Sequence, residues 1–194
     1  MSVTTPRGFR AAGVTAGLKA SGRPDVALVV NDGPDHHAAA VFTGNRVEAA
    51  PVTWSRTVVS DGRADAVVLN SGGANACTGA PGFQDTHRTA EHVAERLGVA
   101  PIEVAVCSTG LIGERLAMTE LLSGVDAAHH ALSADGGPAA AEAIMTTDSV
   151  PKMAAFAMAI RLLQTGLGAL HDDWSQMLAV LAMLSIVLGN LAAI

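Results

Sequence analysis

The chain has 194 residues, of which 49% are hydrophobic and only 3% aromatic, with no tyrosine. This length suffices for one domain with a sizeable core, or for one domain with an appendage. The formal net charge of −6 argues against a nucleic-acid partner, because such a chain repels a phosphate backbone. With so few aromatic residues, alanine, glycine and valine must fill the core, which predicts close-packed layers of small side chains.

Two cysteines, Cys77 and Cys107, form no C-x-x-C pair, and the first six residues do not resemble a secretory signal. Both cysteines are therefore predicted to be reduced thiols of a cytosolic protein.

The composition changes abruptly at Val150-Pro151-Lys152. Residues 1–150 carry the whole net charge, whereas residues 151–194 hold two acidic and two basic residues and four of the seven methionines. The sequence therefore predicts two units, residues 1–150 and residues 151–194.

Several apolar runs in the first half predict strands. Residues 25–30 are followed by a turn, and residues 38–43 then predict the second strand of a hairpin. Residues 64–69 predict a third strand, and residues 47–59 have some strand character around Pro51. The loop of the hairpin contains Asp35-His36-His37, which we expect to be exposed to solvent because a metal site would need further ligands.

Residues 70–79, Asn-Ser-Gly-Gly-Ala-Asn-Ala-Cys-Thr-Gly, contain only small or polar side chains. They match neither a dinucleotide-binding fingerprint nor a Walker A loop, and no helix is expected to begin directly after them. Two interpretations stay open, a surface loop and a functional loop.

Apolar spacing predicts three helices, over residues 85–97, 118–132 and 138–145. Asp85 can cap the start of the first of these helices, and Gly98 follows its end.

Residues 103–113 combine a short apolar strand, residues 104–106, with Cys107-Ser-Thr-Gly110 and a second glycine at Gly113. A strand that ends in hydroxyl and glycine residues exposes hydroxyl and backbone N–H donors, as an oxyanion hole requires. The other interpretation is an ordinary turn after a strand.

Four motifs in order resemble the α-chain part of the ornithine acetyltransferase/glutamate N-acetyltransferase family of arginine biosynthesis. They are Val41-Phe-Thr-Gly-Asn-Arg46, residues 70–79, Cys107-Ser-Thr-Gly-Leu-Ile-Gly113 and Ala143-Ile-Met-Thr-Thr-Asp148. The resemblance covers about residues 8–152. It implies an α/β fold of a mixed sheet packed with helices for residues 1–150.

The resemblance further implies a cytoplasmic enzyme that moves an acetyl group from N-acetylornithine or acetyl-CoA to glutamate through an acetyl-threonine. By motif, the Thr109 hydroxyl and the Gly110 N–H form the oxyanion hole, and Thr146 contacts substrate. No metal and no bound cofactor are implied, and acetyl-CoA is a candidate acetyl donor. A β chain, begun by the nucleophilic threonine after self-cleavage, is required in an α2β2 or larger assembly.

The sequence departs from this family after Pro151-Lys152. No threonine follows an alanine, so the cleavage site and nucleophile are absent, and Gly166-Leu-Gly168 lacks the substrate-binding lysine of the family's Lys-Gly-x-Gly-Met segment. The chain alone is therefore predicted to be inactive.

Residues 153–170 and 177–194 are two apolar runs joined by a polar turn, typical of an all-α transmembrane hairpin. Residues 150–194 also resemble two helices of an antiporter-like membrane subunit of proton-pumping NADH–quinone oxidoreductase. A buried helical pair in a soluble core is the alternative. For the whole chain, three hypotheses stay open: an inactive acyltransferase half, a membrane-inserted fragment, and a chimera with no function as a unit.

Overall fold

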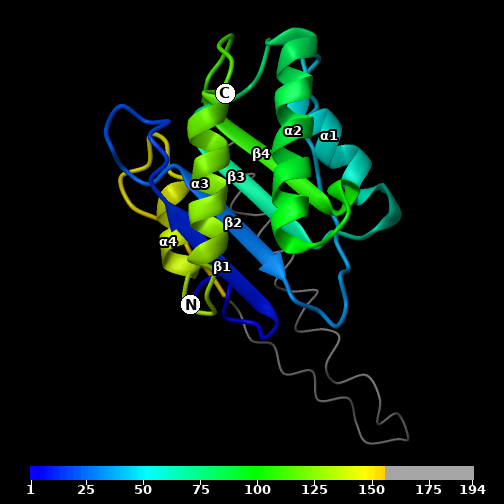
Figure 1. Ribbon diagram of the computed structural model, residues 1–194, viewed down its shortest axis with the longest axis vertical. Coiled ribbons are helices and arrows are strands. Elements are labelled where there is room, and N and C mark those ends of the chain that lie inside the picture. The colour runs from blue at the N-terminus through cyan, green and yellow to red at the C-terminus, as the bar shows by residue number, and fades with distance from the viewer. Residues whose placement is uncertain (156–194) are drawn as a thin grey trace, which may run out of the picture.

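The computed structural model describes residues 1–155, which form a central sheet covered by helices (Figure 1). In chain order the elements are β1 Phe9–Val14, β2 Val26–Asn31, α1 Ala50–Val58, a 3-10 turn at Val59–Asp61, β3 Ala66–Gly73, α2 Gly79–Leu97, a 3-10 turn at Pro101–Glu103, β4 Val104–Leu111, α3 Met118–His130 and α4 Gly137–Ala143. The α/β fold predicted for residues 1–150, a mixed sheet packed with helices, is confirmed.

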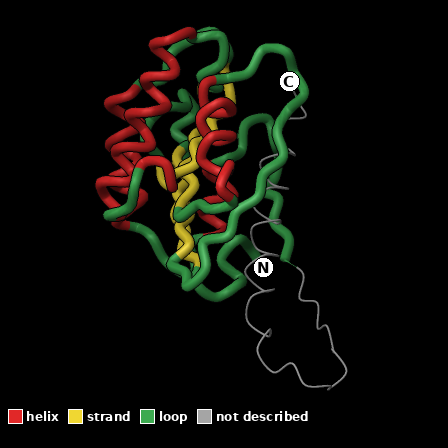
Figure 2. Tube along the Cα trace, turned by 90° about the vertical axis from the view of Figure 1, so that its right-hand side faces the viewer, coloured by secondary structure: helices red, strands yellow, loops and turns green. Residues whose placement is uncertain are grey.

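The sheet has the strand order β1-β2-β3-β4. Strand β2 pairs antiparallel with both β1 and β3, whereas β3 and β4 are parallel. Parallel neighbours need a crossover connection, which α2 provides here. Figure 2 shows the strands between helices on either side, with α2 and α3 on one face and α4 on the other.

All six residues of β2 are buried, so this strand lies at the centre of the core. Val26, Leu28 and Val30 belong to the cluster under α2 and α3, whereas Ala27 and Val29 belong to the cluster under α4. The alternation follows from the two-residue period of a strand. Because both faces are covered, the strand has a continuous apolar sequence, and alanines let α4 approach it closely.

The outer edge of β4 is covered by side chains of α1. The indole Nε1 of Trp54 donates to the Val104 carbonyl at 2.9 Å. The Ser55 hydroxyl donates to the Val106 carbonyl at 2.7 Å and accepts the Val106 N–H at 2.9 Å, so it bonds as a neighbouring strand would. Along the first residues of β4, helix α1 therefore takes the place that a further strand would occupy. The outer edge at the last residues of β4 is not covered by α1.

Asp25 is fully buried, and its carboxylate holds a loop of the chain in place. It accepts four backbone N–H groups of residues 16–19, at distances of 2.6 to 3.1 Å. Its backbone carbonyl accepts the Ser71 N–H at 2.8 Å. Backbone donors compensate a buried carboxylate for the water that it loses, so Asp25 ties this loop to β2 and β3.

Two strand predictions in the first half are wrong. Residues 38–43 form no strand, because the two sides of β2 are occupied by β1, which the sequence pattern missed, and by β3. Residues 47–59 contain α1 rather than strand, since Pro51 lies in the first turn of a helix and its fixed φ suits that position.

The predicted helix at residues 85–97 is confirmed, but it begins at Gly79, so the expectation that no helix follows the 70–79 loop is wrong. Asp85 caps nothing and pairs instead with Arg115 at 2.6 Å. Strand β4 also continues beyond residue 106 to Leu111, because β3 runs beside it as far as Gly73.

The predicted hairpin of residues 153–170 and 177–194 falls almost wholly on residues 156–194, which lie outside the described residues. Within residues 1–155, no helix is long and apolar enough to cross a membrane. The division into units at residue 150 stays a prediction.

Replacing Asp25 by alanine tests its role in holding the loop. Four backbone donors lose their acceptor, so we expect the free energy of unfolding to fall by about 3 kcal/mol, measured by urea denaturation. The control is Asp32→Ala, which breaks a half-exposed ion pair with Arg10 and should cost less than about 1 kcal/mol. Equal losses in the two variants would contradict the assignment.

Candidate active site

The two small-residue stretches singled out in the sequence lie side by side. In the β3–β4 ladder Ser71 is the partner of Thr109, and Gly72 is the partner of Gly110. Beyond the strands, the Ala74 N–H donates to the Leu111 carbonyl at 2.8 Å, so the two segments stay together. The structure therefore brings residues 70–79 and 107–113 into one region.

Gly110 makes a backbone approach that no other residue type allows. Its φ is +131°, and a Cβ at this position would lie 2.4 Å from the carbonyl carbon of Gly72. Gly72 has a φ of +119°, and its own Cβ would lie 2.8 Å from the Leu18 carbonyl oxygen. Three backbone segments are thus stacked at this point, and the outermost is the loop that Asp25 holds.

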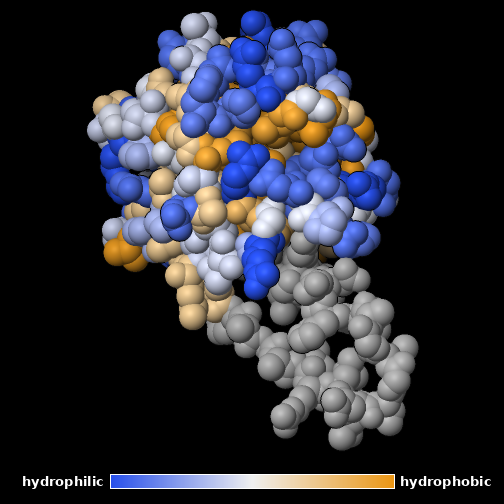
Figure 3. Space-filling view, turned by 60° about the horizontal axis from the view of Figure 1, so that its bottom comes forward, coloured by the Kyte–Doolittle hydropathy of each residue, from blue (hydrophilic) through white to orange (hydrophobic). Residues whose placement is uncertain are grey.

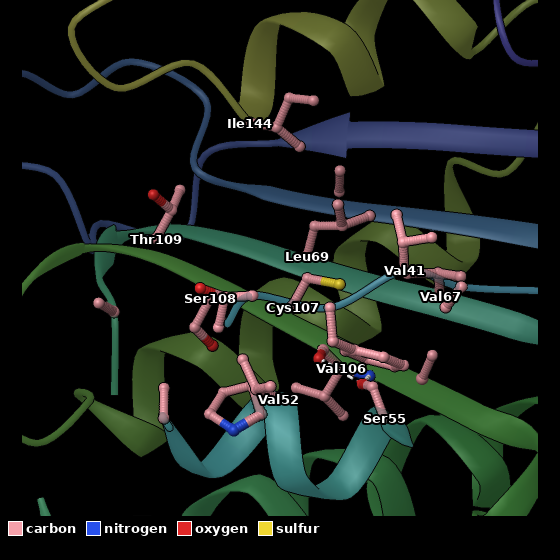
Figure 4. Close-up of a pocket in the computed structure, with 18 of the residues that line it drawn as sticks. Val41, Val52, Ser55, Val67, Leu69, Val106, Cys107, Ser108, Thr109 and Ile144 are labelled. Carbon is pink, nitrogen blue, oxygen red and sulfur yellow. Dashed lines mark hydrogen bonds between the residues drawn. The ribbon is translucent and has the colours of Figure 1, made fainter. Parts of the chain in front are cut away.

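The neighbouring hydroxyls of β4 have different surroundings. The Ser108 hydroxyl donates to Asn70 Oδ1 at 2.6 Å, and Asn70 Nδ2 donates to the Gly73 carbonyl at 3.0 Å. The Thr109 hydroxyl makes no hydrogen bond within residues 1–155, and its half-buried side chain lines a groove. Figure 4 shows the two side chains leaving the strand in different directions, as strand geometry requires.

This groove has a cavity volume of about 520 Å³ and lies over β3 and β4. Its lining is mostly apolar and includes Val41, Val67, Leu69, Val106 and Ile144 (Figure 4). Arg46 is the one charged residue among the described residues that line it. On the face shown in Figure 3, apolar patches interrupt the polar surface. The exposed large apolar side chains of the described residues include Val41, Val47, Leu111, Ile112 and Met153.

Both cysteines line the groove, and no disulfide joins them. Cys77 is exposed and has a φ of +59°, whereas Cys107 is only partly exposed and lines the groove. Burial raises the pKa of the Cys107 thiol to about 12, so this thiol stays protonated at neutral pH.

The 70–79 loop is fixed by its own polar groups. Asn75 is fully buried, and its amide donates to the Gly82 carbonyl at 2.8 Å and to the Thr86 hydroxyl at 2.9 Å. The sequence of this loop is compatible with a surface role and with a functional one. The buried amide favours a fixed loop whose backbone is held against the start of α2.

Thr146 lies in an exposed bend after α4. Ile144 lines the groove, but Thr146 itself does not. The start of this bend is held to β3, because the buried Ser71 hydroxyl donates to the Ala143 carbonyl at 2.5 Å. Ser71 therefore touches the segment before Thr146 and is the ladder partner of Thr109.

The sequence pattern assigned no role to Ser71 or Lys19 and did not predict the Asp85–Arg115 pair. Arg115 follows the second glycine motif and makes two hydrogen bonds, of 2.6 and 2.8 Å, to the buried Asp85 carboxylate in α2. This contact fixes the connection after β4. No local pattern in the sequence links these two positions, which lie 30 residues apart.

No group of three or more His, Cys, Asp or Glu side chains that could hold a metal ion occurs within residues 1–155. Of the two neighbouring histidines, His37 is exposed, whereas His36 is mostly buried, with its Nδ1 2.7 Å from Asp65 Oδ1. The structure thus corrects the prediction of an exposed position for His36.

A family model described as ArgJ family matches residues 10–186, which is most of the chain. The chain belongs to the ArgJ family. The first resemblance found in the sequence is thereby confirmed.

Among named relatives of the ArgJ family, the arginine biosynthesis bifunctional protein ArgJ of Thermobifida fusca is 59% identical over 184 residues. The match covers 93% of this chain and 48% of that protein. The Streptomyces coelicolor protein of the same name is 64% identical over 152 residues, covering 78% of this chain and 40% of that protein. The chain thus spans about half the length of the curated relatives that it matches.

Solved structures of ArgJ relatives share the fold. The ornithine acetyltransferase of Mycobacterium tuberculosis, solved in complex with ornithine, is 60% identical with a TM-score of 0.76. The similarity covers 77% of this chain and 81% of that one. The Bacillus halodurans ArgJ protein is 38% identical with a TM-score of 0.71, covering 77% of this chain and 78% of that one.

The ArgJ match also corrects the expected extent of the resemblance. It continues through residue 186, whereas the sequence motifs ended it near residue 152. The match therefore passes through Pro151-Lys152 and gives no support to a junction between two families there. The likeness to an antiporter-like subunit finds no support in these comparisons.

Gly110→Ala tests the backbone approach, with Gly113→Ala as its matched control. Both glycines have positive φ, but a Cβ at Gly113 would meet no atom within 4 Å. We expect Gly110→Ala to lower the free energy of unfolding by about 2 kcal/mol more than the control, because only there does a Cβ overlap backbone. Equal values in denaturant titrations would show that the contact with Gly72 is loose.

The thiol environments predict two reaction rates with a thiol-specific disulfide reagent at pH 8. Cys77 is exposed and should react quickly, whereas Cys107 should react slowly because the thiolate is the reacting species and its pKa is raised. Cys77→Ser should remove the fast phase alone. In urea both thiols should react at one rate, and a fast reaction of Cys107 in the folded protein would contradict its burial.

Proposed function

We propose that this chain is the α portion of an enzyme that transfers an acetyl group to glutamate in arginine biosynthesis. Membership of the ArgJ family supports this proposal. The relatives carry the name arginine biosynthesis bifunctional protein, and one solved relative is an ornithine acetyltransferase with ornithine bound. The donor is N-acetylornithine, and acetyl-CoA is a second candidate donor.

The chemistry is a two-step acyl transfer through a threonine of the other portion of the protein. Its hydroxyl oxygen attacks the acetyl carbonyl, the C–N bond of the donor breaks, and ornithine leaves with the proton. The amine nitrogen of glutamate then attacks the carbonyl carbon of the acetyl ester, the C–O bond to the threonine breaks, and a proton of the amine returns to the threonine oxygen. Each step passes through a tetrahedral intermediate whose oxygen carries negative charge.

We assign the stabilisation of that oxygen to the Thr109 hydroxyl and the Gly110 N–H. The observation that carries the assignment is the Thr109 hydroxyl, which lines the groove and makes no hydrogen bond within the described part of the chain. A half-buried hydroxyl that makes no hydrogen bond to residues 1–155 is available to a ligand.

Strand geometry supports the role of Gly110. The Val106 N–H points away from β3, because it donates to Ser55 on the outer side of β4. Backbone groups of residues two or four positions apart point to the same side of a strand. From this alternation we infer that the Gly110 N–H faces the outer edge, beyond the part that α1 covers, although its φ of +131° departs from regular strand geometry.

The groove is the surface on which the other portion docks in this proposal. Ornithine and glutamate are charged. Within residues 1–155 the lining carries only the charge of Arg46, which suits apolar side chains of a protein partner better than either amino acid. The groove reaches Thr109, so a partner that fills it brings its threonine to the oxyanion hole. No threonine of residues 1–194 follows an alanine, so the proposal places the nucleophilic threonine outside these residues.

Thr146 is assigned a contact to the substrate, on the strength of its motif and its exposure after α4. An α2β2 or larger assembly stays a prediction from the resemblance. The alternatives, a membrane-inserted fragment and a chimera without function, gain no support from residues 1–155.

Thr109→Ala tests the oxyanion hole in the full chain combined with the other half of an ArgJ protein. Loss of one donor should lower kcat for acetyl transfer about 100-fold to 1,000-fold, with little change in KM, because the donor acts on charge that develops in the transition state.

Thr109→Ser keeps the hydroxyl and should retain most of the activity. Unchanged kcat in Thr109→Ala would refute the assignment. Acetyl transfer by residues 1–194 without the other half would refute the claim that the nucleophile lies elsewhere.

A further inference from the structure

We propose that Lys19 and Ser71 are positioning residues that fix the Thr146 bend relative to Thr109. The proposal rests on the substrate contact assigned to Thr146. It goes beyond that contact because it names the two side chains that set where Thr146 lies.

The Lys19 side chain bonds to backbone oxygens alone, two of them at the end of α4 or just after it. Its ammonium group donates to the carbonyls of Met145 at 2.5 Å, Pro24 at 2.9 Å and Ala143 at 3.5 Å. These three bonds use all the donors of the ammonium group. The positive charge also suits the C-terminal end of a helix, where carbonyls lack intrahelical partners.

The ammonium group is held on a rigid support. The Lys19 N–H is one of the four donors to the buried Asp25 carboxylate, at 3.0 Å. The side chain is half-buried, and burial is the main reason that its pKa lies below the ordinary value. A long side chain that was merely solvated would bind no carbonyl, so the contact to Met145 reflects a fixed geometry.

Ser71 approaches the same helix end from the sheet. Its fully buried hydroxyl donates to the Ala143 carbonyl, which therefore receives one bond from β3 and one from Lys19. Because Ser71 is also the ladder partner of Thr109, one residue contacts both segments of the candidate site.

The consequence is a fixed spacing between the two assigned functional residues. Met145 is buried, and Thr146 follows it directly. Lys19 holds the carbonyl of Met145, so the peptide group between Met145 and Thr146 has one orientation. Without such a restraint, the exposed bend would place the Thr146 hydroxyl in many positions. Substrate binding would then have to fix one of these positions, and the entropy lost would weaken the affinity for the substrate.

The first test uses amide hydrogen exchange of the full chain, which needs no activity. Lys19→Met and Ser71→Ala should speed exchange in the peptide of residues 144–148, whereas residues 104–111 should exchange as before. The matched control is Arg10→Met, which removes a cation paired with Asp32 at the start of β1. Unchanged exchange over residues 144–148 in both variants would overturn the proposal.

The second test is a double-mutant cycle on acetyl transfer, with the other half of an ArgJ protein supplied. Lys19→Met and Thr146→Ala should each raise KM for the acetyl donor about tenfold to a hundredfold, with kcat changing less. Because Lys19 acts through Thr146, the double variant should resemble Thr146→Ala alone. Arg10→Met should leave KM unchanged.

The outcomes separate the two proposals. Additive effects of Lys19→Met and Thr146→Ala would overturn the positioning role, even if Thr146 contacts the substrate. A normal KM in Thr146→Ala would instead refute the substrate contact, and the exchange experiment would still decide whether Lys19 and Ser71 hold the bend.

Discussion

The structure depends on one buried carboxylate. Asp25 accepts four backbone N–H groups of residues 16–19 and, through its own carbonyl, the N–H of Ser71. The loop that it holds presses on Gly72, which in turn lies against Gly110. The same loop carries Lys19, which holds the end of α4. A carboxylate that does not line the groove therefore holds both segments to which functions have been assigned.

Small residues make this arrangement possible. The backbone of Gly110 lies so close to the backbone of Gly72 and Gly73 that a Cβ on Gly110 would overlap their carbonyl carbon and amide nitrogen. Alanines play the same role between β2 and α4. The low aromatic content of the chain is thus a structural requirement of close backbone packing, rather than a deficit of core volume.

The groove over β3 and β4 gives this half-length chain its functional interpretation. Its mostly apolar lining leads to the Thr109 hydroxyl, which makes no hydrogen bond within residues 1–155. Acetyl transfer needs a nucleophile facing that hydroxyl. The proposed oxyanion hole and the proposed docking surface are consequently two parts of one arrangement, in which the partner supplies the attacking group.

The sequence by itself determined the family, the α/β class, the buried strand β2 and the helices α2, α3 and α4, because these depend on motif order and local apolar period. It also singled out the two glycine-containing segments that lie together, since small residues in a row are a local signal. The tertiary structure alone decided that residues 38–43 form no strand, that α1 closes the edge of β4, and that His36 is mostly buried beside Asp65. It also revealed the hydrogen bonds of Asp25, Lys19 and Ser71. These depend on side chains reaching backbone groups distant in sequence, such as Lys19 on Met145, and no local pattern encodes such a contact.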